Sequence, residues 1–299
     1  MKSFRILPIL FILTSGFFSC TKNVNVIPPA YTNKISIQCF IEPDSVPVLY
    51  LNETVPYFDN AIKKNQLVIR NAVVSIESLT GKDILTLDSV FDKIDCQYNY
   101  YYKGKNKIQA NLLYNLTVVR GPAVYKASAQ TDILPAAIDS ISYTAKFNDL
   151  NGEHEGVIVY FKDNPAQVNF YRYELARYID INTKKAEAAI LSTCLGKDSI
   201  YTHELGRAVY NDVGLQGQQI KIVDEPAYSH TKGTKGSVFM QTIDQNAYDF
   251  FDQLDKQKIA VNNPFIEPVF LKSGQFGDKA IGFFSAKSNS RAYPFVYPE

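Results

Sequence analysis

Short segments of alternating apolar and polar residues recur along this chain, and this alternation constrains its fold more than any other feature. In residues 35–41, isoleucine or cysteine occupies every second position, with serine, glutamine and phenylalanine between them. Successive side chains of a β-strand point to opposite faces, so the pattern predicts a strand with one buried face. The alternation returns at residues 72–76, and tyrosine (20) and phenylalanine (19), which favour strands, are abundant. The sequence therefore predicts a mainly β protein.

The first predicted domain covers residues 33–134. Thr80-Gly81-Lys82-Asp83 reads as a hairpin turn that leads into a strand at residues 84–87. Further strands are predicted at residues 48–51, 98–102, 116–119 and 125–129. Six or seven short strands within about a hundred residues are typical of an immunoglobulin-like or transthyretin-like β-sandwich.

The second predicted domain covers residues 135–299 and begins at Pro135, which suits a strand exit because proline cannot donate to a ladder. Antiparallel strands are predicted at residues 138–147, 156–162, 169–179 and 236–243. In the third of these, the tyrosines and leucine at 171, 173 and 175 share one face, and Arg172 and Glu174 share the other. Apolar residues recur at helical spacing within residues 244–257, so one packed helix is expected there, capped by Thr242 or Asp244.

Residues 1–19 read as a secretory signal peptide. Lys2 and Arg5 give a basic start, and residues 6–18 form an apolar run too short for a transmembrane helix. Cys20 directly follows that run, as in the lipobox of a bacterial lipoprotein, so we expect its sulfur and its new amino group to carry lipid. The alternative is an ordinary cleaved signal followed by an incidental cysteine. Several acyl chains would hold the protein at a membrane without a spanning helix.

Residues 20–32 are predicted to be a short tether from the lipidated cysteine, because they are polar and then contain Pro28 and Pro29. Thr21 follows the cysteine where an aspartate would favour retention at the inner membrane, so the outer membrane is expected. The residues after Cys20 lack the acidic run common in surface-exported lipoproteins. A periplasm-facing position is therefore at least as well supported as the cell surface.

Three cysteines remain after Cys20, and an oxidising compartment would permit one disulfide among them. Cys39 and Cys96 fall in the same predicted domain and are the first pair to consider, which leaves Cys194. The alternative of three buried free thiols is favoured slightly, because nothing in the spacing requires a bridge.

The sequence contains no recognisable catalytic, metal or cofactor motif, so a non-enzymatic protein without a cofactor is expected. His203-Glu204 begins like a zinc-protease helix, but Arg207 stands where the second histidine ligand is needed, so exposed turn residues are expected instead. Glu153-His154-Glu155 is expected at a solvated hairpin tip. The 31 basic and 30 acidic residues give a net charge of +1, which offers no support for nucleic-acid binding.

Two further patterns suggest contacts or modification. Four tyrosines in residues 98–102 could form a partner surface, or they could simply belong to an exposed strand; they are Tyr98, Tyr100, Tyr101 and Tyr102. Asp-Ser followed by valine or isoleucine resembles an O-glycosylation site of Bacteroidetes periplasmic proteins, although it also suits turns before strands. The four candidate serines are Ser45, Ser89, Ser140 and Ser199.

Several segments, taken in their order along the chain, resemble a lipoprotein family of the Bacteroidetes known as domain of unknown function 4249. They are residues 71–76, 169–175, 210–218, 247–254 and 281–286, together with the lipobox-like start. The resemblance implies a sandwich in the first half and an accessory role beside TonB-dependent outer-membrane receptors. It supplies no catalytic residues. Asn263-Pro264-Phe265 replaces the glycine-rich approach to the final strand that the family leads us to expect.

The favoured hypothesis is a lipid-anchored, non-enzymatic protein that binds a partner or ligand beside an outer-membrane receptor. A structural scaffold of the envelope is the first alternative. A hydrolase whose carboxylates come from distant strands is the second, because two carboxylates can hydrolyse glycosides without any local motif.

Overall fold

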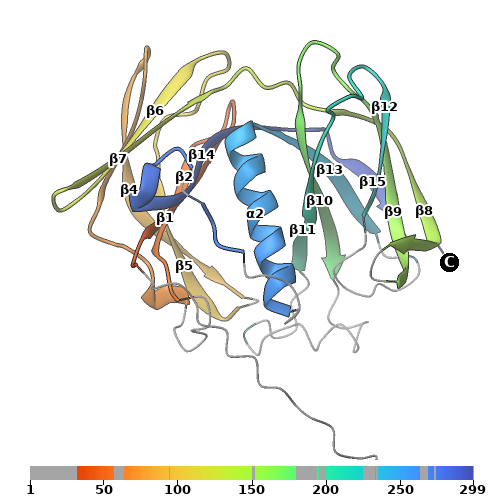
Figure 1. Ribbon diagram of the computed structural model, residues 1–299, viewed down its shortest axis with the longest axis horizontal. Coiled ribbons are helices and arrows are strands. Elements are labelled where there is room, and N and C mark those ends of the chain that lie inside the picture. The colour runs from red at the N-terminus through yellow and green to blue at the C-terminus, as the bar shows by residue number, and fades with distance from the viewer. Residues whose placement is uncertain are drawn as a thin grey trace, which may run out of the picture. The chain divides into compact units, whose positions relative to one another are not determined.

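The structure is a computed structural model that describes residues 32–56, 64–93, 95–149, 152–179, 194, 200–224, 233, 235–262, 269–272 and 274–298 (Figure 1). The elements below belong to the larger of the two compact units of the chain, residues 33–55 with 59–299. The predicted signal peptide and nearly all of the predicted tether lie outside the described residues.

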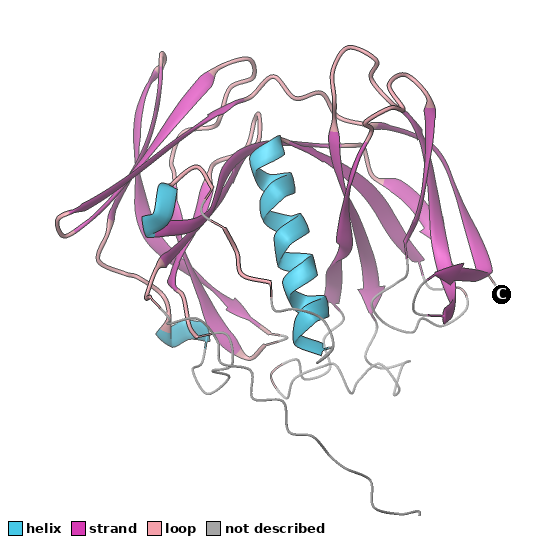
Figure 2. Ribbon diagram, viewed as in Figure 1, coloured by secondary structure: helices cyan, strands magenta, loops and turns pink. Residues whose placement is uncertain are grey.

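The fold is mainly β with a single α-helix among the described residues, as the sequence predicts (Figure 2). Seven strands precede residue 134: β1 (Ile35–Ile41), β2 (Val48–Glu53), β3 (Val73–Ser78), β4 (Gly81–Asp92), β5 (Gln97–Lys103), β6 (Leu113–Arg120) and β7 (Ala123–Gln130). Eight follow: β8 (Ala137–Asp149), β9 (Gly152–Lys162), β10 (Phe170–Ile179), β11 (Ile200–Asn211), β12 (Gln219–Asp224), β13 (Lys235–Ile243), β14 (Ala280–Asn289) and β15 (Tyr293–Val296). The helix is α2 (Gln245–Asn262), and two short 3-10 helices are η2 (Lys64–Gln66) and η4 (Gly277–Lys279).

A single twelve-stranded sheet joins both halves of the chain in the order β11-β10-β13-β14-β1-β2-β5-β4-β3-β6-β7, with β15 also paired to β13. Its central pair, β1 and β14, is parallel, in a register that runs from Ile35 opposite Ala280 to Ile41 opposite Ala286. The remaining strands, β12-β9-β8, form a separate antiparallel sheet. The boundary predicted at residue 134 falls between β7 and β8, but β14 joins the strands of the first half.

Two sandwich cores explain the alternation in the sequence. In β1 every second residue is buried, as predicted, and these side chains pack with buried residues of β2 to β7 and β14 in the first core. The second core lies between the three-stranded sheet and the strands β10, β13 and β15. Tyr171, Tyr173 and Leu175 all enter it from one face of β10, which confirms the predicted division of that strand into two faces.

Helix α2 covers the other face of the central strands (Figure 2). There, Ala247 and Phe250 pack against Ile243 and Phe283. Asp244 caps the helix by accepting a hydrogen bond from the amide of Ala247 at 3.1 Å, so one of the two predicted caps is confirmed. The same carboxylate accepts a bond from the amide of Ala286 at 3.1 Å and thereby ties the start of the helix to β14. Burial raises the pKa of Asp244, against the effect of these hydrogen bonds.

Candidate functional site

The tyrosine-rich strand β5 divides its tyrosines between core and surface. Tyr102 is 3% exposed, donates a hydrogen bond to the carbonyl of Ile69 at 3.0 Å and accepts one from the amide of Ala72. It is therefore a core residue, and the prediction that it belongs to a partner surface is wrong. The buried Leu49 opposite Tyr102 in β2 explains this, because both side chains point into the first core. Tyr98 is 52% exposed.

A cavity of about 360 Å³ opens where β2 and β5 diverge. These two strands pair only through Val48 opposite Lys103 and Leu49 opposite Tyr102, so the first residues of β5 stand away from β2. We call this space the tyrosine cavity, because its lining includes Tyr50, Tyr98 and Tyr100. The guanidinium of Arg70 lies 4.0 Å from the ring centroid of Tyr100, so a cation–π contact holds this ring.

A second cavity, of about 510 Å³, lies between helix α2 and the strands β1, β2 and β14. We call it the phenylalanine cavity, because Phe40, Phe251 and Phe283 line it. The ring centroids of Phe40 and Phe283 are 4.6 Å apart, and those of Phe251 and Phe283 are 5.3 Å apart. Its size falls within the usual range for small-molecule sites, about 300–1,000 Å³.

The two cavities share Gln38 and Tyr50, and we refer to them together as the aromatic groove. Burial, followed by the proximity of Tyr101, raises the pKa of Tyr50, so its phenol stays protonated and able to donate at neutral pH. The rings of Tyr50 and Tyr101 lie 6.1 Å apart, edge to face. The groove thus combines flat apolar surfaces with hydroxyl and amide groups, a composition typical of binding sites.

Two basic residues line the phenylalanine cavity. The ammonium of Lys287 lies 3.2 Å from a carboxylate oxygen of Glu42, and this ion pair is about four-fifths buried. The guanidinium of Arg172 stacks on Phe251, with its central carbon 3.9 Å from the ring centroid. Burial lowers the pKa of Arg172 to about 10, an effect that the carboxylate of Glu174 partly offsets, so the side chain remains charged at neutral pH.

The chain as a whole can be compared with known proteins. A family described as a domain of unknown function, DUF4249, matches residues 22–292. The chain belongs to this family. No curated protein matches it. No helix of the described segments has the length and apolar character needed to cross a membrane.

Two of the segments that resemble the DUF4249 family meet in a buried polar cluster. Asp212 is fully buried, and both of its carboxylate oxygens accept hydrogen bonds from the amide of Asn169 at 3.0 Å. Asp163 accepts bonds from the side chain of Asn169, from the amide of Gly217 at 2.9 Å, and from the hydroxyl of Tyr171. These bonds fasten the β9–β10 and β11–β12 connections to each other.

The carboxylates of this cluster titrate as a pair. Burial raises the pKa of Asp212, and the nearby Asp163 carboxylate adds to that effect. Burial also acts to raise the pKa of Asp163, but hydrogen bonds from Tyr171, Gly217, Asp212 and Asn169 outweigh it and hold the pKa below its usual range. Both carboxyl groups are bound within the fold and neither lines the aromatic groove, so the cluster gives no support to a hydrolase.

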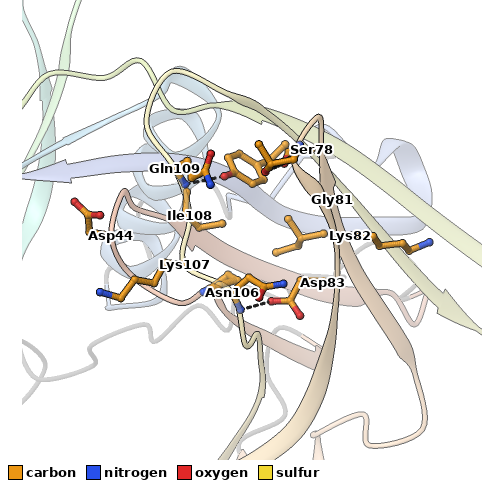
Figure 3. Close-up of a pocket in the computed structure, with 13 residues that line it drawn as sticks. Asp44, Ser78, Gly81, Lys82, Asp83, Asn106, Lys107, Ile108 and Gln109 are labelled. Atoms are coloured by element: carbon orange, nitrogen blue, oxygen red, sulfur yellow. Dashed lines mark hydrogen bonds between the residues drawn. The ribbon is translucent and has the colours of Figure 1, made fainter.

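A polar cavity of about 520 Å³ lies near the β3–β4 hairpin (Figure 3). Asp83 lies at its wall and accepts hydrogen bonds from the amides of Lys105 and Asn106 at 2.7 and 2.8 Å. The hydroxyl of Tyr114 likewise accepts a bond from the amide of Gln109 at 2.7 Å. These contacts fasten the β5–β6 connection to the strands beside it, which is a structural role.

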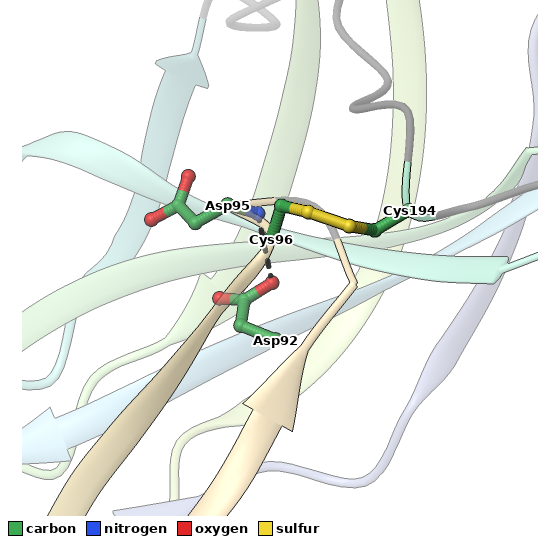
Figure 4. Close-up of a disulfide and its surroundings, with 4 residues drawn as sticks. All are labelled: Asp92, Asp95, Cys96 and Cys194. Atoms are coloured by element: carbon green, nitrogen blue, oxygen red, sulfur yellow. Dashed lines mark hydrogen bonds between the residues drawn. A yellow bond between two sulfur atoms is a disulfide. The ribbon is translucent and has the colours of Figure 1, made fainter.

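The cysteine pairing differs from the prediction. Cys96 forms a disulfide with Cys194, and Cys39 is a buried free thiol in β1 (Figure 4). Both predictions are therefore wrong: Cys39 does not pair with Cys96, and the three cysteines are not all free thiols. The sequence argument chose neighbours within one predicted domain, but the fold brings the β4–β5 hairpin to the β10–β11 connection. Burial raises the pKa of Cys39 strongly, which keeps its thiol protonated.

The histidine segments also lie elsewhere than expected. His203 lies in β11 opposite Ala176, and not in an exposed turn. His154 lies in β9 opposite Phe147, so Glu153-His154-Glu155 is part of a strand and not a hairpin tip. Within the described part of the chain, no three histidine, cysteine or acidic residues are grouped as a metal site would require.

The four candidate glycosylation serines have different settings, and their modification stays a prediction. Ser45 is exposed in the turn after β1, and Ser140 is exposed in β8. Ser89 lies in β4 and is half-buried. Ser199 lies outside the described residues.

Proposed function

We propose that this DUF4249 protein is a lipid-anchored accessory protein of the outer membrane that binds a partner through its aromatic groove and catalyses no reaction. The observation that carries the proposal is the groove itself: two adjoining cavities, one lined by tyrosines and the other by phenylalanines, on one side of the central strands. Exposed tyrosine is enriched in protein interfaces because its ring is apolar and its hydroxyl is polar.

The leader supports the position of the protein in the cell. A basic start, an apolar run and Cys20 are the features of a lipoprotein signal, and the tether would place the folded body on the order of 30 Å from the bilayer. From there the groove would face the periplasm or the cell exterior. The partner that family resemblance suggests is a TonB-dependent receptor in the same membrane. The disulfide agrees with this proposal, because such bonds persist in oxidising compartments.

The anchor is tested by replacing Cys20 with serine in cells fed radiolabelled palmitate. We expect wild-type protein to carry label, to sediment with outer membranes and to co-purify with the receptor. Cys20→Ser should carry no label and should be recovered without membrane. Cys39→Ala is the matched control, because it also removes a thiol but leaves the signal intact. Label that persists in Cys20→Ser, or unlabelled wild-type protein in the medium, would contradict the anchor.

A further inference from the structure

Arg172 is the most informative residue of the groove. It projects from β10 on the face opposite Tyr171 and Tyr173, which enter the second core, and its guanidinium stacks on Phe251 of helix α2. Among the described residues, no oxygen accepts a hydrogen bond from this guanidinium. An arginine carries five N–H donors in a planar fork, and a half-buried fork normally finds acceptors. The donors of Arg172 therefore remain available to a ligand.

Arg172 is the one charged residue in the lining of the phenylalanine cavity that forms no ion pair with another lining residue. The ammonium of Lys287 forms an ion pair with the carboxylate of Glu42 at 3.2 Å, so the charges of these two residues balance. Glu174, the acidic neighbour in β10, lies outside this lining; its carboxylate accepts a hydrogen bond from the neutral side chain of Gln241 at 2.6 Å, and its negative charge still acts on Arg172. Within the lining of the phenylalanine cavity, the charges of Glu42, Lys287 and Arg172 sum to one positive charge. A ligand with a single anionic group would match it.

The remaining surface of this cavity suits a flat apolar body. Phe40, Phe251 and Phe283 line it with their rings in mutual contact, and Gln38 and Tyr50 add polar groups where it meets the tyrosine cavity. Arg172 and Phe251 form one continuous surface, because the guanidinium is stacked on the ring. An aromatic group could pack against this surface while an attached carboxylate reached the guanidinium.

We propose that the phenylalanine cavity binds a carboxylate with an aromatic body, and that Arg172 receives the carboxylate. A planar carboxylate accepts two parallel hydrogen bonds from the arginine fork, which a single-point cation such as lysine cannot provide. The inference deepens the proposed function, since it rests on the groove being a binding surface. It requires neither the lipid anchor nor the receptor.

The test measures calorimetric binding of 2-naphthoate and its neutral isostere 2-naphthamide to the intact protein in lipid nanodiscs, with empty nanodiscs as the blank. We expect 2-naphthoate to bind at least about tenfold more tightly than the amide. Arg172→Met keeps an apolar stem but has no charge, and should abolish this preference. Arg172→Lys should restore only part of it.

Arg70→Met is the matched control, because Arg70 also stacks on an aromatic ring but lies outside the phenylalanine cavity. It should retain the full preference for 2-naphthoate. If Arg172→Met does not fold, the affinities of the wild type and of Phe251→Leu for the two compounds still test the inference. Loss of the phenylalanine ring should weaken the binding of both compounds. Equal affinities for the two compounds, no binding of either, or a preference that survives in Arg172→Met would overturn the inference. Any of these results would leave palmitate labelling and receptor co-purification unaffected.

Discussion

Replacing Gly282 with alanine is expected to prevent the chain from folding, or to lower the free energy of unfolding by more than about 4 kcal/mol. Gly282 lies in β14 directly opposite Ile37 of β1, within the parallel pairing of these two described strands. An alanine Cβ would overlap the carbonyl oxygen of Ile37 and lie 2.8 Å from its carbonyl carbon. All of these are backbone atoms, so no side chain can rotate to relieve the overlap.

Gly282 also has a φ of +114°, which residues with a Cβ rarely adopt. Gly81→Ala separates the two causes, because Gly81 has a φ of +140° but open space around the new methyl group. We expect Gly81→Ala to lower the free energy of unfolding by about 1–3 kcal/mol in chemical denaturation, through backbone conformation alone. Similar losses for both variants would show that β1 and β14 do not approach as closely as described.

Breaking the disulfide between Cys96 and Cys194 is expected to lower the free energy of unfolding by about 3–5 kcal/mol. The two cysteines are 98 residues apart, so the bond closes a long loop and strongly restricts the unfolded chain. It also links the β4–β5 hairpin, beside the tyrosine cavity, to the connection that follows β10. Without this link, the β4–β5 hairpin should be the first part of the fold to open.

Urea denaturation of Cys96→Ser, Cys194→Ser and the double variant measures this effect. We expect all three variants to show the same loss in the free energy of unfolding, since each removes the same bond. Reductant should lower the free energy of unfolding of the wild type to that of the variants, and should not change the variants. Iodoacetamide should not label the native oxidised protein at Cys39, because that thiol is buried and its pKa is raised. Additive losses in the double variant, or a wild type that reductant does not destabilise, would contradict the assigned pairing.

The local pattern of the sequence predicts strands well but does not predict their partners. The alternation in residues 35–41 predicts β1 and its buried face, and the helical spacing near residue 247 predicts α2. Neither pattern contains the parallel pairing of β1 with β14, because that pairing joins segments more than two hundred residues apart. The same limitation explains the cysteines, whose pairing depends on which connections meet in the folded chain.

The sequence predicts only the tyrosine part of the candidate site. The tyrosine run indicated an aromatic surface, although Tyr102 proved to be buried by its position opposite Leu49. The alternation in β10 correctly predicts that Arg172 lies on the face opposite the tyrosines. It does not predict the contact of Arg172 with Phe251, because α2 comes from a distant segment to cover that face. The sequence does not predict the buried cluster of Asp163 and Asp212 for the same reason, although the segments containing Asn169 and Asp212 resemble the DUF4249 family.

Site-specific photo-crosslinking in native membranes tests most directly whether the aromatic groove is the surface that binds the receptor. A photoreactive phenylalanine derivative at position 98 would report on the groove, and the same derivative at position 124 would serve as the control, since Tyr98 and Val124 are equally exposed at 52%. We predict a crosslink to a TonB-dependent receptor from position 98 and none from position 124. Crosslinking from position 124 alone, or equally from both positions, would contradict the proposed role of the groove.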